Sequence, residues 1–178
     1  EGYRWLPTGL NVPWLNYLLV NAPDDYHGGF SWYDIFENPA PGVERSRAAL
    51  MELLDAQRQA GFPAEQIFQF GFSQGCLMTL EMAMRYPHRL AGCIGVSGYV
   101  HEPDTALQEL SPVATQQEIL FTYGTFDPII PAEKVKGQLN QLQTDGGLQI
   151  EAHEFAKEHT IAGVEELSLI RDFIQARG

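Results

Sequence analysis

Apolar and polar positions along the chain form blocks that predict strands and helices in alternation. Short apolar runs followed by Gly or Asn predict buried strands at residues 15–20, 67–70, 90–97 and 119–123. A run at 148–155 alternates more between apolar and polar residues, which predicts a strand at the edge of a sheet.

Between these strands the apolar residues recur at helical spacing. This spacing predicts helices at residues 43–59, 74–85, 131–143 and 163–176. Segments rich in Gly, Pro and Asp predict long loops at 23–42 and 98–117, the second with one helical turn around 106–110.

Strands that alternate with crossover helices are typical of an α/β fold. Because the strands are almost wholly apolar, the pattern predicts a mostly parallel sheet that is covered by helices on both faces. Residues 1–178 show no linker or change in composition, so one domain is expected. In such sheets the chemistry gathers in the loops that follow the carboxyl ends of the strands.

Composition and charge narrow the range of partners that the protein is expected to bind. Of the 178 residues, 44% are hydrophobic and 19% are charged, and the formal net charge is −12. An acidic surface repels phosphate backbones, so nucleic acid is not expected as a partner. The chain has no apolar run of about 18 residues that would predict a membrane span, and no signal peptide is visible.

The two cysteines and the histidines argue against a disulfide framework and against a metal site. Cys76 and Cys93 lie in apolar stretches, which predicts buried free thiols in a reducing compartment and hence a cytoplasmic protein. The sequence has no HxH, HExxH or CxxC pair, so no metal is expected.

The strongest chemical signal is a GxSxG sequence, Gly71-Phe72-Ser73-Gln74-Gly75, between a predicted strand and a predicted helix. This context is typical of a nucleophile elbow, in which glycines on both sides let strand and helix come close together. Ser73 is then the candidate nucleophile, and the backbone N–H of Gln74 at the helix start is a candidate oxyanion donor. A plain Gly-rich turn with a solvent-facing serine is the alternative interpretation.

Asp127 and His159 follow in the order that this architecture requires of the two partners of the serine. Each comes shortly after a predicted strand, so both are expected at the same sheet edge as Ser73. His159 would act as general base and Asp127 would fix its tautomer. Taken alone, each could instead be a capping acid or a solvated loop residue. His101, after the strand at 90–97, either lines the pocket or is a solvated loop residue, and the second is preferred.

With these residues identified, several segments resemble the phospholipase/carboxylesterase family of α/β-hydrolases, which includes the acyl-protein thioesterases. The resemblance extends over nearly the whole chain. It rests on the early NAP segment, the WYDI segment, the GFSQG elbow, the LAG and SG segments and the GTFDPIIP acid loop, at residues 21–23, 32–35, 71–75, 90–92, 97–98 and 124–131.

The resemblance implies cofactor-free hydrolysis of acyl esters or thioesters through an acyl-enzyme. Implied substrates are small-molecule or lipid acyl esters and thioesters, with acylated proteins included, and a homodimer is left open. The resemblance also places Trp32 and Tyr33 near an acyl pocket, although aromatic residues that pack under the loop are an equal alternative.

The sequence departs from the family pattern at two points. Glu158, rather than Gly, precedes His159, and its carboxylate either acts on the imidazole or faces solvent. The family also begins with a strand and an HGLGD-type loop that supplies a second oxyanion N–H, worth about 3–4 kcal/mol in kcat. Trp5 matches a position beyond that loop, so the sequence leaves open whether the loop precedes Glu1 or is lost.

These departures leave a second class of function open. A hydrolase-like binding or interaction protein with an incomplete oxyanion hole and little activity is the alternative to an active enzyme. Hydrolysis with a different leaving group, as in haloalkanoate hydrolases, is a third hypothesis. The serine at the elbow, where a dehalogenase needs an aspartate, argues against it.

Overall fold

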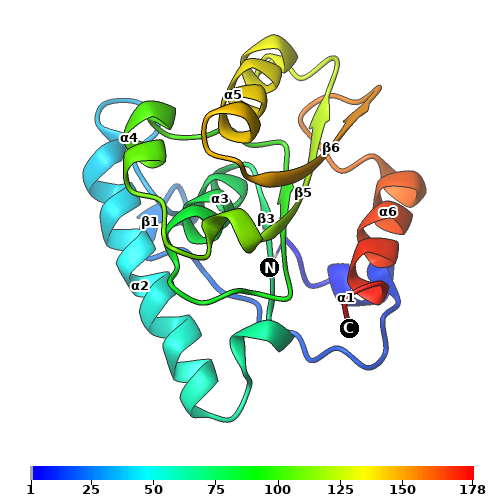
Figure 1. The fold of residues 1–178 in the computed structure, drawn as a ribbon. Helices are drawn as coiled ribbons and strands as arrows, with labels where there is room; N and C mark the ends of the chain where they lie inside the picture. The colour runs from blue at the N-terminus through cyan, green and yellow to red at the C-terminus, as the bar shows by residue number, and fades with distance from the viewer. Residues whose placement is uncertain (1) are drawn as a thin grey trace.

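The central sheet contains four parallel strands whose order in space is their order along the chain (Figure 1). The computed structural model describes residues 2–178. The strands are β3 (Phe68–Phe72), β4 (Gly92–Val96), β5 (Glu118–Gly124) and β6 (Gln149–Phe155). β6 lies at one edge of this sheet, as its alternating sequence predicted, and β3 lies at the other.

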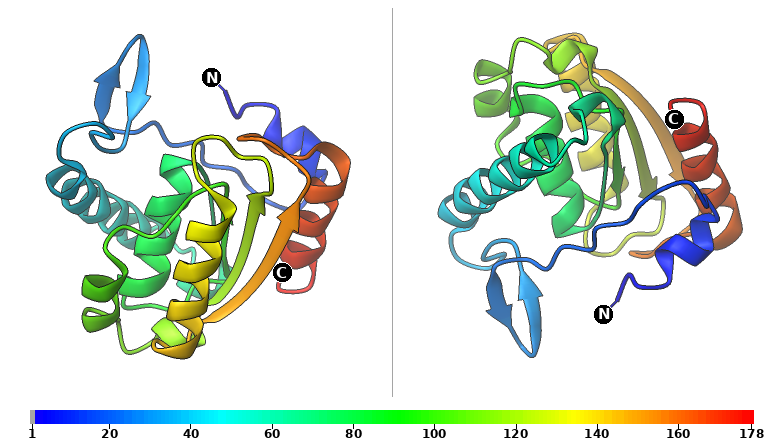
Figure 2. Two further views of the ribbon diagram at one scale, coloured as in Figure 1. Left: turned by 90° about the horizontal axis from the view of Figure 1, so that it is seen from above. Right: turned by 90° about the horizontal axis from the view of Figure 1, so that it is seen from below.

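Helices cover both faces of the sheet, as predicted (Figure 2). Helices α2 and α5 pack on one side together with the central α3, whereas α1 and α6 lie on the other. The helices are α1 (Leu6–Leu10), α2 (Pro39–Gln59), α3 (Gln74–Arg85), α4 (Pro103–Gln108), α5 (Ala132–Thr144) and α6 (Gly163–Gln175), with single 3-10 turns at Ala64–Gln66 and Ala114–Gln116.

Each face of the sheet has its own apolar core. The larger core joins the sheet to the face that carries α3, of which nine of the twelve residues are buried. The smaller core lies under α1 and α6 and is built from Leu6, Leu10, Ile94, Val96, Leu120, Ile170, Phe173 and others. Burial on both faces explains why β4 reads as a continuous apolar run rather than an alternating one.

The parallel register brings the carboxyl ends of the strands to one edge. Phe72 pairs with Val96, and Val96 in turn pairs with Thr122. Gly124 pairs with Phe155 at the end of the β5–β6 ladder. The segments that follow these residues therefore leave the sheet on the same side, which is where the sequence placed its candidate chemistry.

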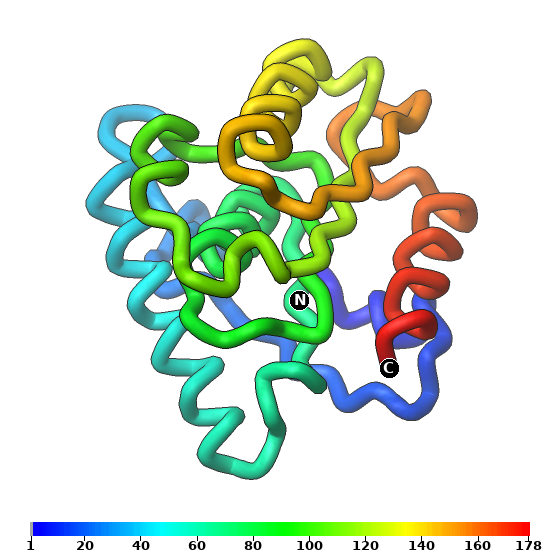
Figure 3. The backbone as a smooth tube through the Cα atoms, in the orientation of Figure 1, coloured from blue at the N-terminus to red at the C-terminus, as the bar shows by residue number. Residues whose placement is uncertain are grey.

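The segment at 15–20 differs from the prediction, because it is irregular and not a buried strand. Three of its side chains, Leu18, Leu19 and Val20, are between 44% and 60% exposed. Among residues 2–178 this segment pairs with no strand, and its apolar composition alone does not supply the hydrogen-bonding neighbour that a strand needs. It runs along the outside of the protein (Figure 3).

The predicted loop at 23–42 also differs, since it contains regular structure. A two-stranded antiparallel hairpin forms from β1 (Asp24–Tyr26) and β2 (Gly29–Ser31), and it projects from the body of the protein (Figure 2). His27 and Gly28, both at positive φ, make its tight turn. Helix α2 begins at Pro39, four residues before the predicted start, because proline is favoured in the first helical turn.

The N-terminal helix α1 was not predicted, and it packs beside the C-terminal helix α6 (Figure 3). Arg171 of α6 donates a hydrogen bond from Nε to the carbonyl of Leu10 at 2.9 Å. A five-residue helix carries too few periodic positions to be read from sequence. Within the described part of the chain, none of the helices combines the length and the apolar character needed to cross a membrane.

Candidate active site

Ser73 lies at the turn between β3 and α3, where its backbone takes a strained conformation. Its φ of 55° and ψ of −115° lie outside the regions that non-glycine residues normally occupy. Such strain persists only where the surrounding structure imposes it, and it is typical of functional sites. The Ser73 N–H donates to the carbonyl of Val96 at 2.9 Å, which fixes this turn against the end of β4.

The turn depends on Gly71, one position before the end of β3. A Cβ atom at Gly71 would lie 2.0 Å from the carbonyl oxygen of Gly75 and 2.6 Å from Oγ1 of Thr79. At Gly75, by contrast, a Cβ atom would meet only Nε1 of Trp32, at an ordinary 3.8 Å. The expectation that both glycines remove colliding side chains is therefore right for Gly71 and wrong for Gly75.

Gln74 is the first residue of α3, and its backbone N–H and its side-chain amide have separate roles. Its backbone N–H belongs to the helix start, where no intrahelical carbonyl is available, so it is free to face a developing negative charge. Its side chain instead holds the segment after β2. It accepts a hydrogen bond from the Trp32 N–H at 2.9 Å and donates one to the carbonyl of Tyr33 at 3.0 Å.

The structure brings Ser73, His159 and Asp127 into one hydrogen-bonded chain. Nε2 of His159 lies 2.9 Å from Oγ of Ser73, and Nδ1 lies 2.7 Å from Oδ2 of Asp127. When Nδ1 carries the proton and donates a hydrogen bond to Asp127, Nε2 is unprotonated and can accept the hydroxyl proton of Ser73. The ring of Phe72 packs 5.0 Å from the imidazole, centroid to centroid, and supports it from the β3 side.

Asp127 is held as a carboxylate in a buried position. Burial opposes its charge, but N–H donors from Ile130 and Ile129, each at 2.9 Å from Oδ1, and the contact with His159 outweigh that cost. The balance keeps the pKa of the carboxyl below its usual value. The side chain is therefore ionised near neutral pH and can orient the imidazole.

Asp127 lies in the loop after β5 and His159 in the loop after β6. Hydrogen bonds between these two loops extend the β5–β6 ladder beyond the strands. The Thr125 N–H donates to the carbonyl of Phe155 at 2.9 Å, and the Phe126 N–H donates to that of Lys157 at 3.1 Å. A Cβ atom at Gly124 would lie 2.4 Å from the carbonyl oxygen of Lys157, so only glycine allows this approach. Asp127 and His159 meet because their loops are joined in this way.

A buried ion pair beside His159 was not found from the sequence. Nζ of Lys157 lies 2.5 Å from Oε1 of Glu166, and the two side chains are 2% and 0% exposed. Desolvation lowers the pKa of Lys157, although Glu166 favours its charged form. One signal could have revealed the pair, since Glu166 precedes the buried Ile170 and Phe173 by four and seven residues and so lies on the buried face of α6.

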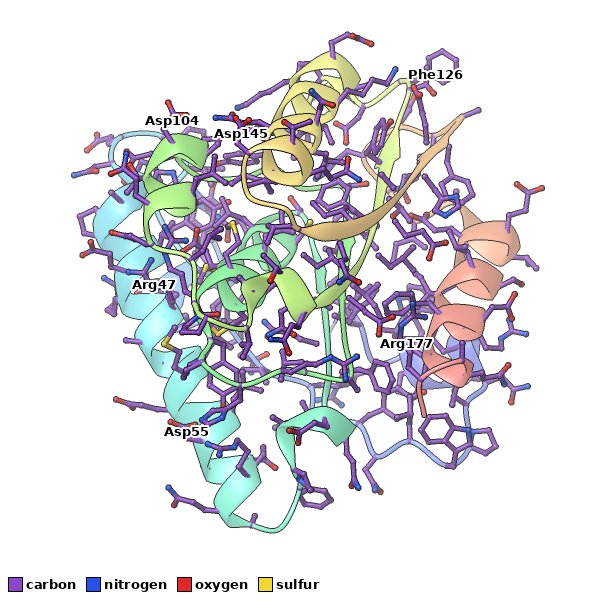
Figure 4. All side chains as sticks on the ribbon, viewed as in Figure 1. Arg47, Asp55, Asp104, Phe126, Asp145 and Arg177 are labelled. Atoms are coloured by element: carbon purple, nitrogen blue, oxygen red, sulfur yellow. The ribbon has the colours of Figure 1, made fainter. Side chains whose placement is uncertain are left out.

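The remaining candidates lie around this chain of hydrogen bonds. Trp32 is half-buried next to α3, whereas Tyr33 is only 1% exposed and belongs to the larger core. Glu158 is exposed. The His101 side chain is only 16% exposed, so the preferred solvated position for it is wrong. Phe126, labelled in Figure 4, is 65% exposed in the loop that leads to Asp127.

The donor atoms needed for a metal site are not gathered in the described part of the chain. Within residues 2–178 no group of three or more His, Cys, Asp or Glu side chains could hold a metal ion. Cys76 and Cys93 are buried free thiols, as predicted, and burial raises the pKa of Cys93 to about 12.

The arrangement of parallel sheet, flanking helices and Ser73 elbow defines an α/β-hydrolase. The model of the family described as Phospholipase/Carboxylesterase matches residues 11–177. The chain belongs to the phospholipase/carboxylesterase family, as its motifs predicted.

Relatives and solved structures agree with this family. The chain is 34% identical to acyl-protein thioesterase 1 of Schizosaccharomyces pombe over 182 residues, which cover 91% of the chain and 81% of that protein. To acyl-protein thioesterase 1 of Yarrowia lipolytica it is 30% identical over 156 residues, covering 82% and 67%. The predicted class of carboxylic ester hydrolase is thereby confirmed.

The crystal structure of SOBER1 from Arabidopsis thaliana superposes with a TM-score of 0.88 at 23% identity. The match covers 99% of this chain and 91% of that one, and it confirms the predicted α/β-hydrolase fold. The crystal structure of esterase PE8 superposes with a TM-score of 0.76 at 26% identity, covering 89% and 76%.

Proposed function

We propose that the protein hydrolyses acyl esters or thioesters through an acyl-enzyme on Ser73. The observation that carries this proposal is the hydrogen-bonded chain Ser73–His159–Asp127, which starts at a strained serine on the N-terminus of α3. A serine hydroxyl needs such a base to become a nucleophile. The names of the relatives, acyl-protein thioesterase and carboxylesterase, agree with this chemistry.

In the proposed first half-reaction, Ser73 attacks the substrate and His159 acts as its base, as their contact allows. Nε2 of His159 takes the hydroxyl proton of Ser73 while Oγ bonds to the substrate carbonyl carbon. The backbone N–H of Gln74 faces the oxygen that becomes negative. When the tetrahedral intermediate collapses, the bond to the leaving alkoxide or thiolate breaks, and the imidazolium of His159 protonates that group.

In the second half-reaction, water takes the place of the leaving group. His159 accepts a proton from the water as its oxygen bonds to the acyl carbon, and the same proton returns to Oγ of Ser73 when the acid leaves. Asp127 stays ionised throughout and stabilises the imidazolium, in agreement with its lowered pKa. No step needs a cofactor.

The acyl group of the substrate is expected to lie beside the segment after β2. Gln74 holds the backbone of Trp32 and Tyr33 to the helix that carries Ser73. Trp32 then offers an aromatic surface to the acyl chain, and the buried Tyr33 supports the segment from the core. Trp32→Ala should raise KM for a p-nitrophenyl ester of a long acyl chain more than for the acetate.

Covalent labelling with a fluorophosphonate and hydrolysis of p-nitrophenyl esters test the proposal. Wild-type protein should be labelled and Ser73→Ala should not. Both Ser73→Ala and His159→Ala should lower kcat at least about a thousandfold. His153→Asn is the matched control, since Nε2 of this β6 histidine lies 2.8 Å from Oε1 of Glu151, and the variant should keep its activity.

Two outcomes would contradict the proposal. Activity retained in Ser73→Ala would show that another residue is the nucleophile. A folded wild-type protein that neither reacts with the probe nor hydrolyses any ester would instead favour a binding or interaction protein with a hydrolase fold.

A further inference from the structure

The Glu166 carboxylate accepts hydrogen bonds from three donors, one on β5 and two on the segment that contains His159. Its Oε1 accepts hydrogen bonds from Nζ of Lys157 at 2.5 Å and from the hydroxyl of Thr122 on β5. Its Oε2 accepts the backbone N–H of Ala162 at 2.5 Å. The carboxylate is fully buried at the first turn of α6.

Two of these donors are the two ends of the segment that carries His159. Lys157 lies two residues before the histidine and Ala162 lies three residues after it. Thr122, the third donor, is a buried residue of β5, which leads into the loop of Asp127. One carboxylate therefore fastens both ends of segment 157–162 to the strand that also positions the acid.

Net stability does not explain this arrangement. A buried ion pair gains little over well-packed apolar residues of similar volume, because both charges must leave water. The smaller core on this face of the sheet contains apolar residues such as Leu120 and Ile170, and leucine or methionine would fit its chemistry. What an apolar pair could not supply is an acceptor for the Ala162 N–H and the Thr122 hydroxyl.

We propose that Glu166 and Lys157 are positioning residues of the hydrolase, which hold the imidazole of His159 between Ser73 and Asp127 by fixing both ends of segment 157–162. The inference rests on the proposed function. Neither residue touches the reacting atoms, so each acts through the placement of His159. A displacement of about 1 Å at a reacting group can lower a rate about a hundredfold.

The test compares two double variants that both remove the charges together. Lys157→Met/Glu166→Leu frees both ends of the segment, whereas Lys157→Met/Glu166→Gln keeps an amide oxygen that can still accept the Ala162 N–H. The first should lower kcat about a hundredfold with KM within about twofold of wild type. The second should recover most of kcat, because one end stays fixed.

Glu81→Gln is the matched control for the loss of a buried carboxylate. Glu81 is 2% exposed and pairs with Arg47 and Arg85 on the opposite face of the sheet. Its loss should lower the unfolding temperature and leave kcat unchanged. If Lys157→Met/Glu166→Leu keeps the wild-type kcat, or if both double variants have the same kcat, the positioning role is overturned.

Ala162→Pro provides a second test that leaves both charged side chains in the protein. The φ of Ala162, −77°, suits proline, and the substitution replaces the N–H that binds Glu166 by a ring carbon, which also pushes the carboxylate away from this end of the segment. Ala162→Pro should lower kcat, by a smaller factor than Lys157→Met/Glu166→Leu does, and leave KM unchanged. A wild-type kcat in a folded Ala162→Pro protein would overturn the inference even if the double variants do not fold.

Hydrogen exchange separates this inference from the proposed function. The amides of residues 157–162 should exchange faster in Lys157→Met/Glu166→Leu than in wild type, and Glu81→Gln should leave them unchanged. This measurement needs no turnover. An inactive wild type would therefore contradict only the proposed function. Unchanged exchange at residues 157–162 would contradict only the inference that Glu166 fixes both ends of this segment.

Discussion

Replacing Gly71 by alanine tests whether the Ser73 turn depends on direct contact between strand and helix. The added Cβ atom would lie 2.0 Å from the carbonyl oxygen of Gly75 and 2.2 Å from its carbonyl carbon. Both are backbone atoms, so no side-chain rotation can relieve the overlap. Real Cβ atoms keep at least 3.0 Å from such neighbours, and α3 must therefore retreat by about 1 Å or more.

This retreat has two measurable consequences. Overpacking of this kind costs about 1–3 kcal/mol of unfolding free energy, which urea denaturation can measure. Because Ser73 is attached to the start of α3, a shift of about 1 Å also moves Oγ relative to His159, and kcat for a p-nitrophenyl ester should fall about a hundredfold. KM should change less, since the segment around Trp32 remains.

Two other glycines provide the controls for Gly71→Ala. A Cβ atom at Gly75, in the same motif, meets only Nε1 of Trp32 at 3.8 Å, so Gly75→Ala should lose far less activity. Gly137, inside α5, has no atom within 4 Å of the added Cβ, and Gly137→Ala should stabilise the protein by up to about 1 kcal/mol. Wild-type stability and kcat in Gly71→Ala would refute the reasoning.

Three further predictions follow from single contacts. Gly124→Ala should lower kcat, because its Cβ atom would lie 2.4 Å from the carbonyl oxygen of Lys157 and push the His159 loop away; unchanged kcat would contradict this. The folded-state pKa of Asp127 lies below its usual value of 3.8, so its stabilising effect is lost as pH falls through that lower pKa. Urea unfolding from about pH 5 downward should thus show a shallower loss of stability in Asp127→Asn than in wild type. Cys76 and Cys93 should not react with a disulfide reagent until the protein is unfolded, because burial raises the pKa of both thiols, and rapid reaction of the native protein would count against their burial.

The parts of the fold that the sequence predicted well are those that are buried on two sides. The helix predicted at 74–85 has the same bounds in the structure, because it begins directly after the turn at Ser73, Pro87 follows its end, and its apolar face lies on the sheet. The strands at 119–123 and 148–155 agree with β5 and β6 to within a residue or two. In these elements the local preference and the tertiary packing favour the same conformation.

The prediction failed where a segment depends on a neighbour that local patterns cannot show. Residues 15–20 have the composition of a strand, but composition indicates only a tendency to be buried. The hairpin of β1 and β2 was instead predicted as a loop, since its strands are only three residues long and largely exposed. Neither hydrophobic periodicity nor propensity is informative at that length.

The convergence of Ser73, Asp127 and His159 was predictable from chain order, whereas the contacts that hold them were not. A parallel sheet delivers the ends of β3, β5 and β6 to one edge, so a serine, an acid and a histidine shortly after those strands lie on the same side of the sheet. Glu166 could not be placed in this way, because a charged residue on a helix is usually solvated. Only its register with Ile170 marks it as buried.

The geometry of the site therefore depends on the backbone as much as on the three side chains that would carry the reaction. Gly71 lets α3 reach β3, and Gly124 lets the segment before His159 reach the end of β5. Each approach is closer than any side chain would permit, and each helps to set the position of one residue of the proposed site, Ser73 or His159. The small size of the glycines allows these close approaches, and Glu166 then fixes segment 157–162 by hydrogen bonds to Lys157 and Ala162. An esterase that retained Ser73 but lost either glycine would be expected to fold with the same topology and to misplace the proton transfer on which hydrolysis depends.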